Sequence, residues 1–229
     1  MHYAPRTIAF LCELLHPPVT PDPAPIQRIH NELFQAGDPA YQSFHSLPGG
    51  AVLSNPVTRP GAVSAAEFLA DRIRFREELT GATVDDFAVR VVGLSGRAAE
   101  LRGVQIFTAQ TVVVRTLVNP RHFADSRSFL REGLLGLEGE TRAFEREPEL
   151  LGLRLVFRPT RDEPWAFSLR VESFGNDPRS IFLENHGTFG PVIVARGLDV
   201  VRTNVERTYE FVTSRALSFL EHFDVRLGT

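Results

Sequence analysis

Three consecutive segments in the second half of the chain alternate between apolar and polar residues: LGLRLVFRP, PWAFSLRVESFG and RSIFLENHG. A period of two is typical of a β-strand, because successive side chains point to opposite faces of the sheet. The turn-rich pieces TRDEP and GNDPR separate these segments, which favours hairpins. The chain is therefore expected to contain an antiparallel sheet with one apolar face and one mixed face.

The mixed face combines arginines, acids and aromatic residues. From the alternation it carries Arg154, Val156, Arg158, Arg170, Glu172, Phe174, Phe182, Glu184 and His186. We expect Arg170–Glu184 and Arg154–Glu172 to form cross-strand ion pairs worth ~0.2–1 kcal/mol each. Such a face can simply be exposed to water, but arginine beside aromatic groups is also typical of interfaces. The candidate binding residues are Arg154, Arg170, Glu172, Phe182, Glu184 and His186, for a protein or an anionic ligand.

Other segments predict further strands and helices. The β-branched run Val104–Val118 indicates a central strand. Apolar residues recur at helical spacing over Leu198–Phe223, which predicts an amphipathic helix that buries Phe219 against the sheet. A helix is also expected from Thr83, a suitable N-cap, to Leu101. The segment Ser64–Glu78 fits either a helix or a strand.

The two halves of the chain share an order of elements: a strand, a helix, further strands and a second helix. FLCELLHP and VVRTLVNP each end a strand before a helix, and RIRFREELTG resembles RSIFLENHG in position. We therefore expect one compact domain built from two pseudo-repeats, residues 1–103 and 104–229. The expected fold class is α+β, with one antiparallel sheet, helices on one face and a saddle-like shape.

The composition excludes several functions. The net charge of −3 argues against nucleic acid as a partner, since phosphate binding needs a basic excess. All 25 basic residues are arginine, so Schiff-base and P-loop lysine chemistry is excluded. Cys12 is the sole cysteine, and no apolar run approaches the ~18 residues of a membrane span. These features favour a soluble cytoplasmic protein, and a homo-oligomer stays open.

No motif in the sequence identifies a reaction. The patterns G-x-S-x-G, G-x-G-x-x-G and H-E-x-x-H are absent. Cys12 and His16 are too far apart along an extended strand for a nucleophile pair, and the His and Cys spacings predict neither a metal site nor a cofactor. The chain is thus expected to be a non-enzymatic binding or assembly protein. The alternative is a hydrolase in which Glu184 or Glu172 and His186 act as acid and base.

Four segments carry a family resemblance: FLCELLHPP, VVVRTLVNP, RSIFLENHG and NVERTYEFVTSRALSFLEHF. Together they resemble a sporadically distributed family of uncharacterised bacterial proteins of similar length. The resemblance covers most of the chain but implies no activity, cofactor or catalytic residue. The duplicated layout is also similar to saddle-shaped folds such as the TATA-binding protein and small-molecule effector-binding domains, although the acidic charge differs from that of a DNA-binding saddle.

Overall fold

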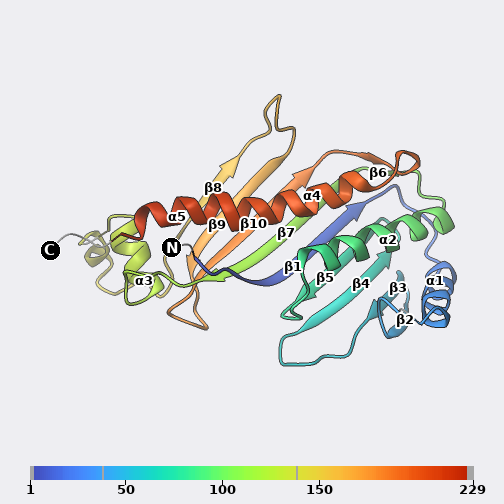
Figure 1. The fold of residues 1–229 in the computed structure, drawn as a ribbon, viewed down its shortest axis with the longest axis horizontal. Coiled ribbons are helices and arrows are strands. Elements are labelled where there is room, and N and C mark those ends of the chain that lie inside the picture. Colours follow the sequence, from blue (N-terminus) through green and yellow to red (C-terminus); the bar gives the residue numbers. More distant parts are fainter. Residues whose placement is uncertain (1–2, 38, 138, 226–229) are drawn as a thin grey trace.

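A nine-stranded antiparallel sheet forms the centre of the protein (Figure 1). This computed structural model describes residues 3–37, 39–137 and 139–225. The strands follow one another across the sheet in the order β2 (Ser43–Leu47), β3 (Gly50–Ser54), β4 (Val63–Leu69), β5 (Arg72–Glu78), β1 (Arg6–Leu15), β7 (Ala109–Val118), β10 (Ile181–Phe189), β9 (Ala166–Ser173) and β8 (Gly152–Phe157). The expected α+β class with an antiparallel sheet is confirmed.

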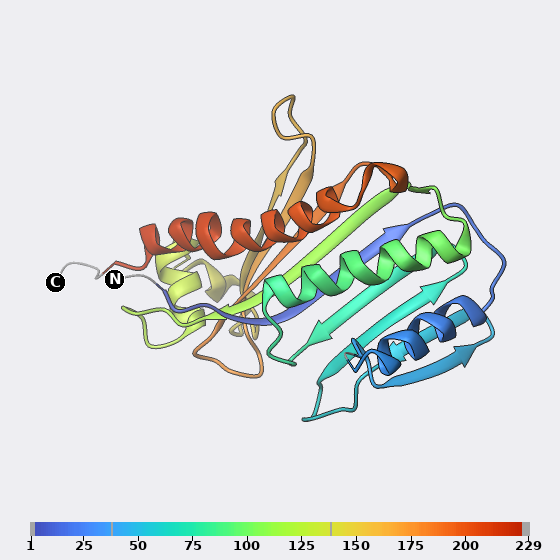
Figure 2. The same ribbon diagram turned by 45° about the vertical axis from the view of Figure 1, so that its right-hand side comes forward.

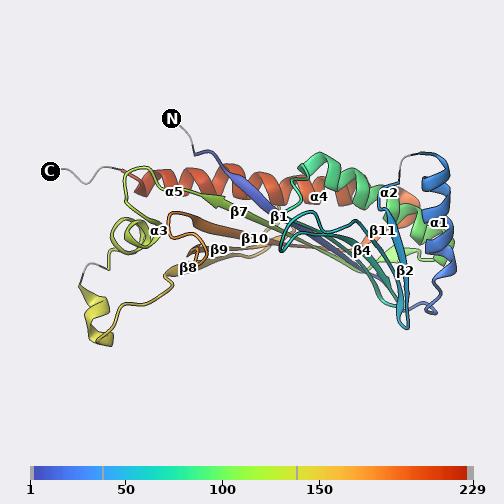
Figure 3. The same ribbon diagram turned by 90° about the horizontal axis from the view of Figure 1, so that it is seen from below.

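Long helices cover one face of this sheet. Helix α2 (Val84–Arg102) contacts β1 and β5, whereas α4 (Asp199–Glu210) contacts β7 and β10. Figure 2 shows the two helices side by side, with α1 (Ala24–Gln35) near the β2 edge. Seen from below, the sheet is arched and the helices lie on its convex side (Figure 3). In the described part of the chain, the middle of the opposite face has no helix over it.

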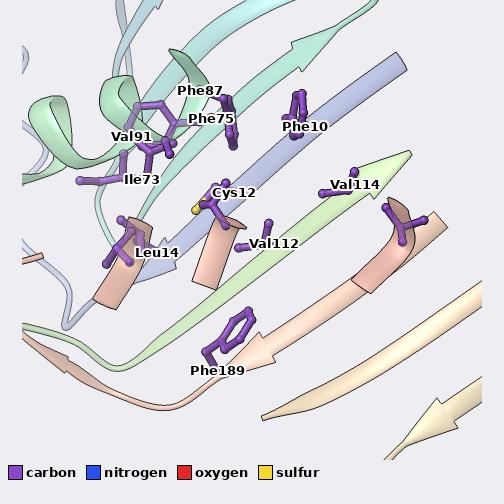
Figure 4. Packing of buried hydrophobic residues seen from close by; sticks show 14 of the residues in the cluster. Phe10, Cys12, Leu14, Ile73, Phe75, Phe87, Val91, Val112, Val114 and Phe189 are labelled. Atoms are coloured by element: carbon purple, nitrogen blue, oxygen red, sulfur yellow. The ribbon is translucent and has the colours of Figure 1, made fainter. Parts of the chain in front are cut away.

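The core lies between the helices and the sheet. Phe87 and Val91 of α2 point toward Phe10 of β1 and Phe75 of β5 (Figure 4). The Phe10 and Phe87 rings stack with centroids 5.3 Å apart, and each buried side chain of this size contributes ~1.5–3 kcal/mol. Thr83 caps α2 as expected, because its hydroxyl accepts from the Asp86 amide at 3.2 Å.

The structure resolves one ambiguous segment, Ser64–Glu78, and corrects one predicted strand, Val104–Val118. The ambiguous segment is two strands, β4 and β5, since its apolar residues alternate with a period of two. The run Val104–Val118 is not a single strand, because it divides into β6 (Ile106–Phe107) and β7. Between them the Thr108 amide donates to the Leu15 carbonyl at 2.7 Å. Strand β6 instead pairs with β11 (Val192–Ile193) in a separate two-stranded sheet.

The last helix follows the prediction in length but not in register. Between α4 and α5 (Leu217–Phe223) the residues Phe211–Ala216 form a π-helical segment, η4. A π-turn contains an extra residue, so it rotates the apolar stripe that follows it. Leu220 is therefore fully buried, whereas Phe219 is only partly buried and packs against Phe223. The expectation of a buried Phe219 was wrong for this reason.

Shorter helical segments connect β7 to β8. The first is α3 (Ser126–Ser128), which continues directly into a π-helical segment, η1 (Phe129–Leu134). Asp125 caps α3 through its carboxylate, which accepts from the Ser128 amide at 2.8 Å. A 3-10 segment, η2 (Glu140–Phe144), precedes β8, and another, η3 (Val194–Arg196), precedes α4.

Candidate functional site

The open sheet face carries a row of in-register side chains that crosses six strands. The register places these residues next to one another in the order Glu78, Ala9, Arg115, Glu184, Arg170 and Arg154, from β5 to β8. Side chains in direct register share a face of the sheet. The alternation in the sequence had placed Glu184, Arg170 and Arg154 on this face correctly.

Arg115 connects the two halves of this row. Its guanidinium contacts Glu184 at 2.7 Å and Glu78 at 3.1 Å. Glu184 also forms an ion pair with Arg170 at 3.2 Å, and this is the cross-strand pair that the sequence predicts. Arg170 lies 3.7 Å from Glu172 as well. These charges alternate in sign along the row, so most of them are balanced within the protein.

Aromatic side chains pack beside Arg170. Its guanidinium lies over the Phe182 ring, 5.2 Å from the centroid, which is within cation–π distance. Phe182 stacks in turn on Phe174, with centroids 5.9 Å apart. Phe182 is buried by these neighbours. It supports Arg170 from below, and it adds little exposed apolar area of its own.

The expected pair between Arg154 and Glu172 is wrong. Strand register places Glu172 opposite Gly152, whereas Arg154 lies directly opposite Arg170. Arg154 instead donates from Nε to the Ser168 hydroxyl at 2.8 Å. Two arginines are therefore direct register neighbours at the β8 end of the row. The exposed Val156 follows Arg154 on the same face.

Glu184, Asn185 and His186 do not form one cluster. Asn185 is completely buried on the helix side, and its amide donates to the Thr208 carbonyl at 3.1 Å. His186 is exposed on the open face, in register with Ser168 and Val113. It lies two residues along the strand from Glu184, a spacing of about 6.5 Å.

Strand β5 contributes a second group of ion pairs, which the sequence interpretation missed. Glu13 of β1 contacts Arg74 at 2.8 Å and Arg72 at 3.4 Å, and Arg74 reaches Glu67 of β4 at 3.3 Å. The signal was present in RIRFREE, where arginines occupy alternate positions. This alternation places the arginines on one face only if the segment is a strand, and its sequence also fits a helix.

Cys12 and His16, on and just after β1, are both buried. Burial raises the pKa of the Cys12 thiol to about 12, so the thiol stays protonated at neutral pH. His16 hydrogen-bonds the Pro17 carbonyl at 2.8 Å. Across residues 3–37, 39–137 and 139–225, no three His, Cys, Asp or Glu residues gather in a way that could hold a metal ion. The described helices include none that is long and apolar enough to cross a bilayer.

Comparisons with known proteins add no functional assignment. No protein-family model and no curated protein matches the sequence. Among solved structures, the regulatory subunit of aspartate kinase from Thermus flavus aligns over 92% of this chain and 98% of its own. The TM-score is 0.23 and the sequence identity 9%, values too low to support an argument about fold or function.

Proposed function

We propose that the protein is a non-enzymatic binding protein that docks an acidic surface of a protein partner on its open sheet face. Arg154 and Arg170 carry this proposal, because they are direct register neighbours with no carboxylate between them. Arg154 donates to the Ser168 hydroxyl and not to a carboxylate. Elsewhere along the row the arginines alternate with glutamates. The β8 end is therefore where an acidic partner gains most.

The surroundings of this pair also favour docking. Val156, 64% exposed, lies beside Arg154 and offers apolar area. Glu184 and Phe182 hold Arg170 in place, so a partner meets a guanidinium that is already oriented, and less side-chain entropy is lost on binding. Arginine with apolar neighbours is a composition enriched at protein interfaces.

The hydrolase alternative has less support. A general base must be able to accept a proton from substrate, yet the Glu184 carboxylate already receives Arg115 and Arg170. Glu172 lies near Arg170 in the same group. His186 is exposed and lies apart from these pairs along the strand. The arrangement favours electrostatic recognition over proton transfer.

The remaining proposals concern organisation and location. We propose that residues 1–103 and 104–229 are pseudo-repeats, because β1 and β7 pair at the centre of the sheet and each unit ends in a long helix. The buried Cys12 thiol fits a reducing cytoplasm. We also propose that the protein can form a homo-oligomer, which a measurement of its molar mass in solution tests.

Site-directed crosslinking tests the docking face. Val156 is replaced by a photoreactive phenylalanine derivative, and crosslinked proteins are captured from the native host and sequenced by mass spectrometry. We expect crosslinks to acidic segments, and we expect Arg154→Glu to reduce their yield at least about tenfold, or ~1.4 kcal/mol. Arg154 is exposed, so its replacement should change folding by less than ~0.5 kcal/mol.

Arg196→Glu is the matched control, because Arg196 is an exposed arginine on η3 before α4. It makes the same charge change away from β8 and should leave the yield unaltered. Equal crosslinking in the wild type and in Arg154→Glu would reject the proposed face. Measurable hydrolysis that disappears in His186→Ala would favour the enzyme instead.

A further inference from the structure

A pocket of about 900 Å³ lies on the helix side of the sheet, between α1, the first half of α2 and the strands β4 and β5. Its volume falls in the range of about 300–1,000 Å³ typical of small-molecule sites. The in-register row from Glu78 to Arg154 lies on the open face, which is the opposite face of the sheet. Any function of this pocket is therefore independent of the proposed docking surface.

A buried carboxylate forms the floor of the pocket. Glu77 follows the core residues Ile73 and Phe75 on the inner face of β5 and is 2% exposed. Its Oε1 accepts from the Ser64 hydroxyl at 2.8 Å, from the Tyr41 hydroxyl at 3.4 Å and from the guanidinium of Arg90. An apolar residue at this position would cost less free energy to bury, because removing a charge from water is unfavourable even when the charge is paired.

The groups around Glu77 are held in fixed orientations. Asn55 accepts from the Gln42 amide at 3.0 Å and donates to the Ser64 hydroxyl at 2.9 Å, which directs that hydroxyl toward Glu77. The Arg90 guanidinium lies over the Tyr41 ring, 5.1 Å from its centroid. Burial, together with the charge of Glu77, raises the pKa of Tyr41, so its phenol remains a donor. Such preorganisation reduces the entropy lost on binding.

Gly93 in the lining of the pocket gives a second, independent observation. It lies in the middle of α2, where glycine costs ~0.5–1 kcal/mol relative to alanine. A Cβ at Gly93 would meet nothing within 4 Å, and its φ is not in the left-handed region. Neither packing nor backbone conformation requires glycine here. Gly93 shares a face of α2 with the lining residues Arg90 and Arg97, so a side chain at this position would extend into the pocket.

The charges of the lining indicate the ligand. Three acids, Glu77, Asp85 and Asp86, line the pocket with two arginines, Arg90 and Arg97. Both arginines are already engaged, Arg90 by Oε1 of Glu77 and Arg97 by Glu32. Asp85 is paired as well, with Arg202 at 3.3 Å. The second oxygen of Glu77, Oε2, receives none of the donors that contact Oε1. We propose that this pocket binds a small molecule with a protonated amine, which interacts with the carboxylates of Glu77 at the floor and Asp86 at the rim.

Calorimetric titration tests this with three probes: 1,4-diaminobutane, lysine and succinate. The first two carry protonated amines, and lysine adds a carboxylate that distinguishes zwitterionic from purely cationic ligands. We expect one or both amines to bind with a Kd of about 1 mM or lower, near −4 kcal/mol, and succinate not to bind. Binding of succinate alone, or of no probe, would overturn the proposal.

Two helix variants locate the binding. Gly93→Phe should place a ring in the space that Gly93 lines and keep α2 folded, because phenylalanine is a better helix former than glycine. It should weaken amine binding at least about tenfold. Gly96→Ala is the matched control, since Gly96 faces Leu198 of the neighbouring helix region at ordinary contact distance. It should bind amines as the wild type does. Amine binding that survives Gly93→Phe would place the ligand elsewhere.

Glu77→Gln tests the floor of the pocket. The amide keeps the shape of the side chain but removes its charge, so amine affinity should fall at least about tenfold. Circular dichroism establishes whether the variant is folded. A folded Glu77→Gln protein with unchanged amine affinity would contradict the assigned role of Glu77. If the variant does not fold, the comparison of Gly93→Phe with Gly96→Ala decides the question.

Discussion

Arg115 and Glu78 form an ion pair of 3.1 Å that crosses strand β1 above Ala9. Ala9 is in register with both residues, and it is 3% exposed although it belongs to the open face. The methyl side chain is short enough for the two charged groups to meet over it. Ala9 thereby lets the alternating row continue from one half of the sheet to the other.

Ala9→Leu should interrupt this connection. The larger side chain must displace the Arg115–Glu78 pair or shift the strand, so we expect a loss of ~1–3 kcal/mol, as for other overpacked sites. Urea unfolding measures the effect. Val113→Leu is the control, because Val113 lies half-buried on the same face and should change stability by less than ~1.5 kcal/mol. Equal stability of Ala9→Leu and the wild type would show that the pair does not depend on Ala9.

The π-helical segment makes a second prediction about the last helix. Leu220→Ala should cost ~2–5 kcal/mol, because Leu220 is fully buried. Phe219→Ala should cost less, although phenylalanine is larger, since its ring is only partly buried. Both values come from denaturant unfolding of the purified variants. The reverse order would mean that the helix continues in α-helical register through Phe211–Ala216.

The sequence predicts side-chain placement well wherever a strand is recognised as a strand. Glu184, Arg170 and Arg154 were assigned to the open face by their spacing alone, and the register agrees. The pairing of Arg154 with Glu172 failed, because which residues lie opposite each other depends on hairpin geometry, and a shift of two residues leaves every face unchanged.

Two other features depended on long-range information. Glu77 occupies the same face as Ile73 and Phe75, so an acid at a core position was visible in principle. The assignment required β5 to be identified as a strand first. The extra residue in the π-helical segment has no signal in a helical repeat, and it rotates the stripe that follows so that Leu220 is buried in place of Phe219.

A third prediction concerns the buried carboxylate of Asp224. This residue follows α5 and links it to the segment that precedes β1. It accepts from the Tyr3 hydroxyl at 2.7 Å and from the amides of Arg121 at 2.7 Å and His122 at 3.0 Å. Burial opposes ionisation of Asp224, but these hydrogen bonds outweigh it and lower its pKa. Asp224→Asn should therefore cost ~1–3 kcal/mol at pH 7, because it leaves buried donors without a suitable acceptor.

The pH dependence of this variant follows from the same shift. A carboxyl group with a lowered folded-state pKa stabilises the protein above its unfolded pKa of ~3.9, and that contribution disappears as the pH falls through the folded value. The stability difference between the wild type and Asp224→Asn should thus be full at pH 7 and 5 and shrink near pH 3. A difference that is constant across this range would show that ionisation of Asp224 does not contribute.

The last prediction compares neighbours on opposite faces of β10. His186→Ala should alter stability by less than ~0.5 kcal/mol, because His186 is exposed. Asn185→Asp replaces the amide that donates to the Thr208 carbonyl with a buried carboxylate facing that oxygen, and should cost ~3–5 kcal/mol at pH 7. Burial would raise the pKa of the introduced carboxyl, so the penalty should shrink as the pH falls and the protonated group can donate. Unfolding at pH 7 and pH 4 measures both variants. A penalty in Asn185→Asp that does not change with pH would contradict the placement of Asn185 beneath α4.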